Sequence, residues 1–173
     1  MPSVKECQAK VEELVKSHGF GNSKEDAPLK LLFAFVEVGE AVKAWQEAQE
    51  SGNLDDVVEE LVDVLFYTLD FHRLSGFPDL DDRRSLSTIS AQARLSTPEE
   101  HFLQLVRSLA ETADAWKKGK DARLGAQLTD RTIDSIVLTA RCVKPDSDLD
   151  QAFVAKFEKN MRRPFRYGEA YKR

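Results

Sequence analysis

The sequence predicts an all-α protein, built as one bundle of about six helices over residues 1–173. The first observation is that apolar residues recur at steps of three and four through most of the chain, the spacing of one helix face. The second is that glycine and proline are sparse, at 8 and 6 of 173 residues, which disfavours short strands and tight turns. The third is a composition of 42% apolar and 32% charged residues, typical of a globular domain with a substantial core.

Composition also excludes several classes of function. The net charge of -5 disfavours non-specific binding to nucleic acid through the overall field of the protein. Two cysteines are too few for a disulfide framework and indicate reduced thiols. The charged N-terminus lacks the apolar core of a signal peptide, and no apolar run approaches membrane-spanning length. We therefore expect a cytoplasmic protein that binds neither nucleic acid nor a membrane.

The first helix is expected over residues 3–17, where Val4, Cys7 and Val11 begin a single apolar stripe that glycine ends at Gly19. A polar loop follows at 21–27. Side chains near this helix end, His18, Phe20 and Asn22, could line a site. A helix end closed by a buried aromatic side chain is the favoured interpretation.

The second and third helices are expected over residues 27–50 and 54–74, with Pro28 in the first turn of one and Asn53 capping the other. The apolar face of the second is predicted to contain Leu29, Leu32, Phe33, Val36, Glu40 and Ala44. Gly39 lies in mid-helix, where glycine costs about 1 kcal/mol relative to alanine. A residue this small would let a neighbouring backbone or a ligand approach closely.

The second half of the chain is predicted to be helical after a long connection over 75–96 that has room for a short helix. The sequence Thr97-Pro98-Glu99-Glu100 is a capping box that opens a fourth helix over 98–118. A fifth is expected over 121–143, before Lys144-Pro145. Asp146 or Ser147 then caps a sixth, which runs through Met161 and ends at Pro164.

Two acidic pairs stand out within the apolar runs: Glu37 and Glu40 on the second helix, Glu60 and Asp63 on the third. Side chains three residues apart project from the same side of a helix. The short turn at 51–53 makes the two helices antiparallel neighbours and brings the pairs to similar heights. Four carboxylates together need a cation, and all-oxygen ligation suits Mg²⁺ or Mn²⁺. The alternative is that these residues lie on solvated helix faces.

A faint internal repeat relates the two halves at a constant offset of 71 residues. Leu32, Glu40, Ala44, Trp45, Asp63 and Thr68 match Leu103, Glu111, Ala115, Trp116, Asp134 and Thr139. Ser108 and Arg131 stand where the first half has Glu37 and Glu60, so the second half lacks a complete acidic set. We divide the domain into an active repeat (28–75), a degenerate repeat (97–143) and a C-terminal helix and tail (146–173). Four unrelated amphipathic helices are the alternative.

The acidic motif resembles that of the all-α nucleoside triphosphate pyrophosphohydrolases, which include MazG-like enzymes, dimeric dUTPases and phosphoribosyl-ATP pyrophosphatases. It is Glu-x-x-Glu followed after 19 residues by Glu-x-x-Asp, within Val-Glu-Val-Gly-Glu-Ala and Glu-Glu-Leu-Val-Asp-Val-Leu-Phe-Tyr. The match covers residues 28–72. The segment with Lys156, Asn160, Arg163 and Tyr167 is similar to a C-terminal helix that contacts phosphate or nucleotide in some members. A solvated basic face is its alternative.

The resemblance implies that Mg²⁺, held by Glu37, Glu40, Glu60 and Asp63, lowers the pKa of a water that Glu37 orients or deprotonates. A nucleoside triphosphate such as dUTP or dCTP would be cleaved to the monophosphate and pyrophosphate, in a protein that forms a homodimer. Trp45 and Trp116 are expected in the core rather than as stacking platforms for the base. Two alternatives are a phosphoribosyl-ATP pyrophosphatase-like activity and a non-catalytic helical module that binds a protein partner.

Overall fold

The computed structural model confirms the all-α class: the residues it describes, 2–81, 84–89, 97–119 and 121–163, form six α-helices and no strand. None of these helices is both long and apolar enough to cross a bilayer, within the described ranges. The helices are α1 (Val4–Ser17), α2 (Ala27–Ser51), α3 (Asp55–Ser75), α4 (Pro98–Lys117), α5 (Ala122–Val143) and α6 (Leu149–Met161), with short 3-10 helices η1 (Lys24–Asp26) and η2 (Leu86–Thr88).

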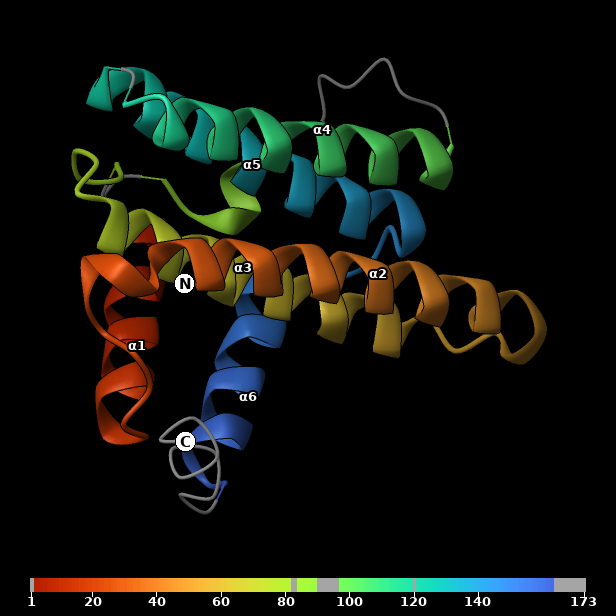
Figure 1. Cartoon of the computed structure of the whole chain (residues 1–173). Helices are drawn as coiled ribbons and strands as arrows, with labels where there is room; N and C mark the ends of the chain where they lie inside the picture. Colours follow the sequence, from red (N-terminus) through yellow and green to blue (C-terminus); the bar gives the residue numbers. More distant parts are fainter. Residues whose placement is uncertain (1, 82–83, 90–96, 120, 164–173) are drawn as a thin grey trace.

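Helix α3 is the centre of the bundle and contacts α1, α2, α5 and α6. It pairs along its length with α2, and this pair forms the middle layer in Figure 1. The hairpin of α4 and α5 covers one side, whereas α1 and α6 extend from the other and contact each other. Residues on every side of α3 are buried, from Val57 to Leu74. Burial on all sides is expected of a helix in such a central position.

Local sequence signals account for most helix ends. The Ser3 hydroxyl accepts a hydrogen bond from the Glu6 N–H (3.2 Å), and the Glu6 carboxylate accepts one from the Ser3 N–H (2.6 Å). Thr97 caps α4, and the αL residue Gly52 (φ 72°) ends α2. The predicted cap of α6 at Asp146 or Ser147 is wrong: Asp148 caps it, because its carboxylate accepts from the Gln151 N–H at 3.0 Å.

The predicted apolar face of α2 is wrong. Leu29, Leu32 and Val36 are 40%, 61% and 52% exposed, and Glu40 is exposed as well. The face buried in the bundle is made mainly of small residues: Ala27, Leu31, Ala34, Val38, Ala41 and Ala48. The first half of α2 is apolar on both faces, so periodicity alone does not choose between them. Alanine lets the α2 and α3 backbones approach closely, and the larger side chains face outward.

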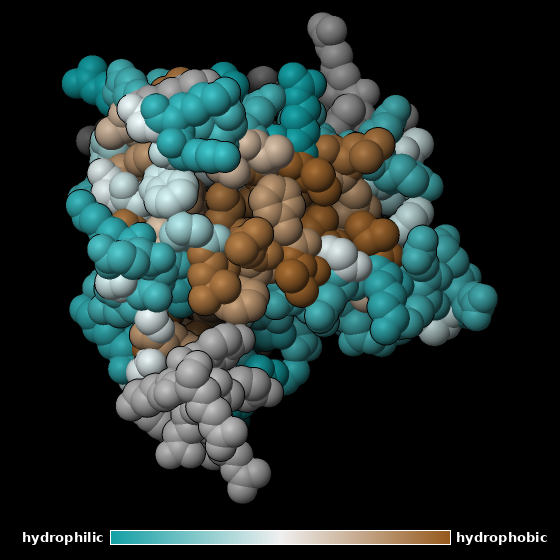
Figure 2. Space-filling view, viewed as in Figure 1, coloured by the Kyte–Doolittle hydropathy of each residue, from teal (hydrophilic) through white to brown (hydrophobic). Residues whose placement is uncertain are grey.

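The outward face of α2 joins the neighbouring helix α4 in one exposed apolar patch, which we define as Leu29, Leu32, Val36, Leu103 and Val106. Figure 2 shows a continuous hydrophobic area on the face where α2 and α4 run. A patch of neighbouring aliphatic side chains is more informative than single exposed leucines, because such patches commonly mark interaction surfaces.

The connection between α3 and α4 is anchored to the bundle at several of its described residues. Leu80, Leu86 and Ile89 are buried, and η2 is the short helix for which the sequence had room. The Arg141 guanidinium of α5 donates to backbone carbonyls of this segment, including that of Leu86 at 3.2 Å. Asp150 of α6 accepts from the Ser87 N–H at 3.2 Å. These bonds fasten the long connection to the bundle.

The hairpin of α4 and α5 has hydroxyl groups in its interior. Ser108 and Ser135 are hydrogen-bonded at 3.1 Å, and so are Thr112 and Thr132. Asp134, the residue that matches Asp63 in the predicted repeat, forms an ion pair with Arg84. Among these residues, the second hairpin therefore has no cluster of unpaired carboxylates like the one predicted for the first.

Both tryptophans pack against the core, as predicted. The Trp45 ring centroid lies 6.0 Å from that of Phe102, and the Trp116 centroid lies 6.0 Å from that of Phe71. These contacts also join the two hairpins, because each tryptophan meets a ring from the other hairpin.

Gly39 is open to solvent in mid-helix, and a Cβ added there would meet no described atom within 4 Å. Its φ is not positive. We predict that Gly39→Ala raises the free energy of unfolding by about 1 kcal/mol, because alanine has the higher helix propensity. Chemical denaturation measures this change. The matched control, Gly52→Ala, should lower stability, because its φ of 72° strains an alanine. A destabilised Gly39→Ala would contradict the prediction.

Candidate metal centre

The pairing of α2 and α3 brings three of the four predicted carboxylates together. Three carboxylate oxygens, one from each of Glu37, Glu60 and Asp63, lie within 4.8 Å of one another. All three residues are partly buried. The antiparallel turn after Gly52 sets this register, as the sequence indicated. Three oxygen ligands at this spacing fit a hard divalent cation.

Glu40 lies outside this group of three. Its side chain is exposed, on the same outward face of α2 as Val36, whereas Glu37 turns toward α3. Glu40 is still close enough for its charge to raise the pKa of Glu37 and of Glu60. The structure therefore places Glu40 at the solvent side of the cluster rather than within it.

The three clustered carboxyl groups are held in an environment that disfavours their charge. Burial, and then the charges of Asp63, Glu40 and Glu60, raise the pKa of Glu37 from 4.5 to about 7. Burial and Asp63 raise the pKa of Glu60, and burial raises that of Asp63. Crowded, partly desolvated carboxylates gain from a cation that replaces the missing solvation.

Lys156 of α6 supplies one positive charge to the cluster. Its ammonium lies 2.5 Å from the Asp63 carboxylate and 2.8 Å from that of Glu59, and only 6% of its side chain is exposed. Burial alone would lower the pKa of Lys156, but hydrogen bonds to Asp63 and Glu59 raise it. Lys159 also pairs with Glu59 at 2.5 Å, and hydrogen bonds from the two lysines lower the pKa of Glu59 to about 2. Glu59 therefore helps to hold the Lys156 ammonium beside Asp63.

A cavity of about 400 Å³ opens beside the carboxylates, since Glu37 and Asp63 form part of its wall. Its volume is within the range of small-molecule sites. The lining residues come from four helices, α1, α2, α3 and α6, or from just beyond their ends: Val11, Leu14, Val15, His18, Phe20, Lys30, Phe33, Val36, Glu37, Asp63, Phe66, Tyr67, Asp70, Asn160 and Arg163. Most are apolar or aromatic, and Glu37, Asp63 and Asp70 are the carboxylates among them.

His18 and Phe20 both close the end of the first helix and line a cavity, the two interpretations that the sequence allowed. His18 is the C-cap of α1, and its ring stacks on Phe20 with centroids 6.0 Å apart. Both side chains line the cavity, whereas exposed Asn22 does not.

Two of the four predicted phosphate-binding residues line the cavity. Asn160 and Arg163 line the cavity, and the charge of Arg163 lowers the pKa of Asp63, although burial of that carboxyl raises it overall. The Oδ1 atom of Asn160 is buried without a hydrogen-bond partner among the described residues. Lys156 already contacts the carboxylates. Tyr167 lies outside the described residues.

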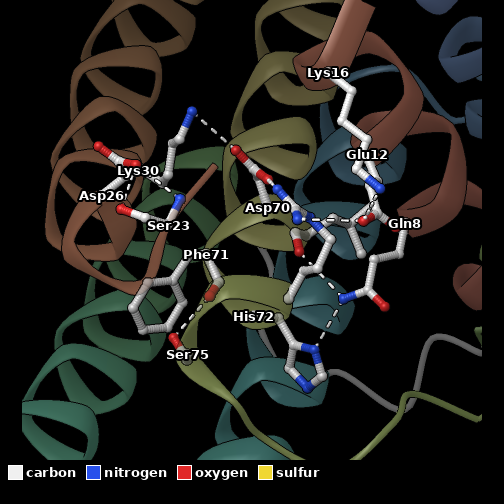
Figure 3. A network of polar contacts seen from close by, with 12 residues as sticks. Gln8, Glu12, Lys16, Ser23, Asp26, Lys30, Asp70, Phe71, His72 and Ser75 are labelled. Atoms are coloured by element: carbon white, nitrogen blue, oxygen red, sulfur yellow. Dashed lines mark hydrogen bonds and ion pairs between the residues drawn. The ribbon is translucent and has the colours of Figure 1, made fainter. Parts of the chain in front are cut away.

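A buried ion pair that was not predicted, Lys30 with Asp70, lies at the cavity wall. The Lys30 ammonium lies 3.0 Å from the Asp70 carboxylate, and the two side chains are 8% and 2% exposed. Arg73 and Glu12 extend the network toward Lys16 at the surface, as Figure 3 shows in part. Asp70 stands within a run of buried residues, and a charge in such a position requires a partner. That signal indicates a buried Asp70 with a partner but does not identify Lys30 as the partner.

Comparison with models of protein families, with curated proteins and with solved structures finds no match to this chain. The resemblance to nucleotide pyrophosphohydrolases therefore rests on the acidic motif itself and stays a prediction.

The raised pKa of Glu37 predicts a pH-dependent stability. Without metal, folded Glu37 keeps its proton up to pH of about 7, whereas the unfolded chain loses it near 4.5, so stability falls as pH rises through that interval. We predict that Glu37→Gln is more stable than the parent at pH 8 by roughly 1–2 kcal/mol after allowance for solvent screening. At pH 5 the difference should be small. Thermal unfolding in a chelator measures both.

The control for this comparison is Glu47→Gln on the exposed side of α2, where no pH-dependent gain is expected. An equal gain for Glu37→Gln at pH 5 and pH 8 would show that the charge of Glu37 is not the cause.

Proposed function

We propose that the protein is a Mg²⁺-dependent pyrophosphohydrolase of nucleoside triphosphates, acting on a pyrimidine deoxynucleotide such as dUTP or dCTP. The observation that carries this proposal is the convergence of Glu37, Glu60 and Asp63 beside a cavity of about 400 Å³. A metal-binding cluster next to a largely apolar cavity suits a ligand with a polyphosphate at one end and a ring at the other.

The residues present fit a hard cation. Glu37, Glu60 and Asp63 would hold it, with Glu40 on the solvent side. Burial, and for Glu37 and Glu60 also the neighbouring carboxylates, raises their pKa values, and a bound cation would offset both effects. When bound, Mg²⁺ (or Mn²⁺) supplies charge neutralisation to the phosphates and acidifies water. The carboxylate chemistry alone does not distinguish these two ions.

The protein's own residues would perform the remaining tasks. Glu37 lies at the cavity wall within the carboxylate cluster, where its second oxygen can orient the attacking water and accept its proton. Water attacks the α-phosphorus, the bond to the bridging oxygen breaks, and the products are the nucleoside monophosphate and pyrophosphate. Asn160 and Arg163 face the same cavity and would contact phosphate oxygens, and Lys156 can do so after it leaves Asp63. A cytoplasmic location fits this role and the free thiols of Cys7 and Cys142.

Release of pyrophosphate tests this function. The protein with Mg²⁺ should convert a deoxynucleoside triphosphate to equal amounts of monophosphate and pyrophosphate. Glu60→Gln should lower kcat/KM on the order of 100-fold or more, the scale of losing one electrostatic group of an active site. Glu47→Gln, remote from the cluster, is the control. Absence of pyrophosphate and phosphate from a panel of common and modified triphosphates would refute the proposal.

A non-catalytic helical module is the second candidate, and the exposed apolar patch favours it. The two candidates differ in metal binding. Calorimetry should detect Mg²⁺ binding that Glu60→Gln abolishes if the carboxylates form a metal centre. No binding of the metal, with or without nucleotide, would support the module instead.

A second copy of the chain is the partner that we propose for the apolar patch, to form a homodimer. Val36 belongs both to the patch and to the cavity wall, so a partner seated there would cover the cavity side of α2. One ion pair on each helix lies beside the patch, Lys43–Glu47 on α2 and Arg107–Glu111 on α4. Each contributes a basic and an acidic side chain, so a two-fold related copy can place opposite charges against each other.

Sedimentation tests the dimer. Introducing Leu32→Glu together with Leu103→Glu should give a folded monomer, since both leucines are exposed in one chain. Leu124→Glu, an exposed leucine of α5, is the control and should leave the dimer intact. A parent protein that sediments as a monomer at every concentration would contradict this proposal.

A further inference from the structure

Lys30 places a fixed positive charge in the wall of the cavity. It lies in the first turn of α2, two turns before Glu37, and both residues line the cavity. Its side chain is 8% exposed, so its ammonium is held away from bulk solvent. Long lysine side chains normally extend to water, and one that is retained inside a wall needs a reason.

Asp70 holds the Lys30 ammonium in place but does not cancel its charge. The Asp70 carboxylate also accepts hydrogen bonds from the Arg73 guanidinium, at 2.5 and 3.2 Å. Arg73 is itself only 15% exposed and lies 3.5 Å from Glu12, which is committed to Lys16 at 2.7 Å. One buried carboxylate therefore serves a buried lysine and a partly buried arginine. Because Asp70 is shared in this way, the Lys30 ammonium favours a further hydrogen-bond acceptor in the cavity.

The Lys30 ammonium has the capacity for that acceptor. It carries three N–H donors. Asp70 is its one ionic partner in the part of the chain that the structure describes, and the Phe20 ring centroid lies 5.8 Å from its nitrogen. The rings of Phe33 and Tyr67, with centroids 5.2 Å apart, form another part of the same wall. A flat ring between aromatic side chains, with an acceptor atom directed at Lys30, matches these surroundings.

We propose that Lys30 is a specificity-determining residue that selects a pyrimidine ring bearing a carbonyl oxygen over one bearing an amino group at the same position. A carbonyl accepts a hydrogen bond from the ammonium. An amino group brings its own N–H donors against those of Lys30 and leaves both unpaired in a dry site. This inference rests on the proposed function, because it assumes that the cavity receives the base of the nucleotide.

The test is binding of deoxyuridine and deoxycytidine, measured by calorimetry without divalent ions. The two rings differ by a carbonyl or an amino group at C4 and by an N–H or a lone pair at the neighbouring N3. The parent protein should bind deoxyuridine about 10-fold or more tightly than deoxycytidine, the scale of one hydrogen bond to a charged group. Lys30→Met keeps the length of the side chain and removes its donors, so the ratio should fall to near one. Lys43→Met, an exposed lysine of the same helix, should keep the parent ratio.

Loss of the Lys30 charge leaves Asp70 with Arg73, and if that variant does not fold, Lys30→Met combined with Asp70→Asn removes both charges and carries the same expectation. The proposal is overturned if the parent binds neither nucleoside, binds both equally or prefers deoxycytidine. It is also overturned if the preference persists without Lys30. Nucleosides lack phosphate and the assay lacks metal, so this result is separate from pyrophosphate release: either proposal can fail while the other stands.

Discussion

The close packing of α2 on α3 is the contact on which the candidate site depends. An alanine-rich face lets the two helices run side by side for most of their length. That contact fixes their register, and the register places Glu37 opposite Glu60 and Asp63. A larger residue at Ala34 or Ala41, both fully buried, would separate the helices and with them the carboxylates. The site is therefore a consequence of helix packing rather than of a dedicated loop.

Features encoded by local sequence were predictable, and features decided by tertiary contacts were not. Ser3, Thr97 and Gly52 act within one turn of their helices, so the helices themselves were recognisable. The acidic cluster was predictable because one short turn relates its two helices. The buried face of α2 was not, since leucine and alanine faces share one period. Lys30 and Asp70 meet only after folding, and no sequence feature near either residue identifies its partner.

Three acidic residues, of which Asp70 is buried and two are partly buried, pair with a basic residue from another segment. Lys30 pairs with Asp70, Lys156 with Asp63, and Arg84 with Asp134. In the second hairpin Arg84 pairs with both Asp130 and Asp134, and Ser108 stands at the repeat position of Glu37, so fewer carboxylates meet there. Asp63 shares its lysine with Glu59 and remains beside two more acids, so the charge on the first hairpin is only partly matched.

The ion pair between Lys156 and Asp63 couples α6 to the carboxylate cluster on α2 and α3. Helix α6 is anchored on α3 by the stack of Phe153 on Phe66, at 4.6 Å, and by this ion pair. A cation that takes over the Asp63 oxygens removes one electrostatic anchor of α6 and leaves the pairs of Lys156 and Lys159 with Glu59 and the aromatic stack. Occupancy of the site and the opening of α6 are then thermodynamically linked, and amide hydrogen exchange along α6 becomes a reporter of what the carboxylates hold.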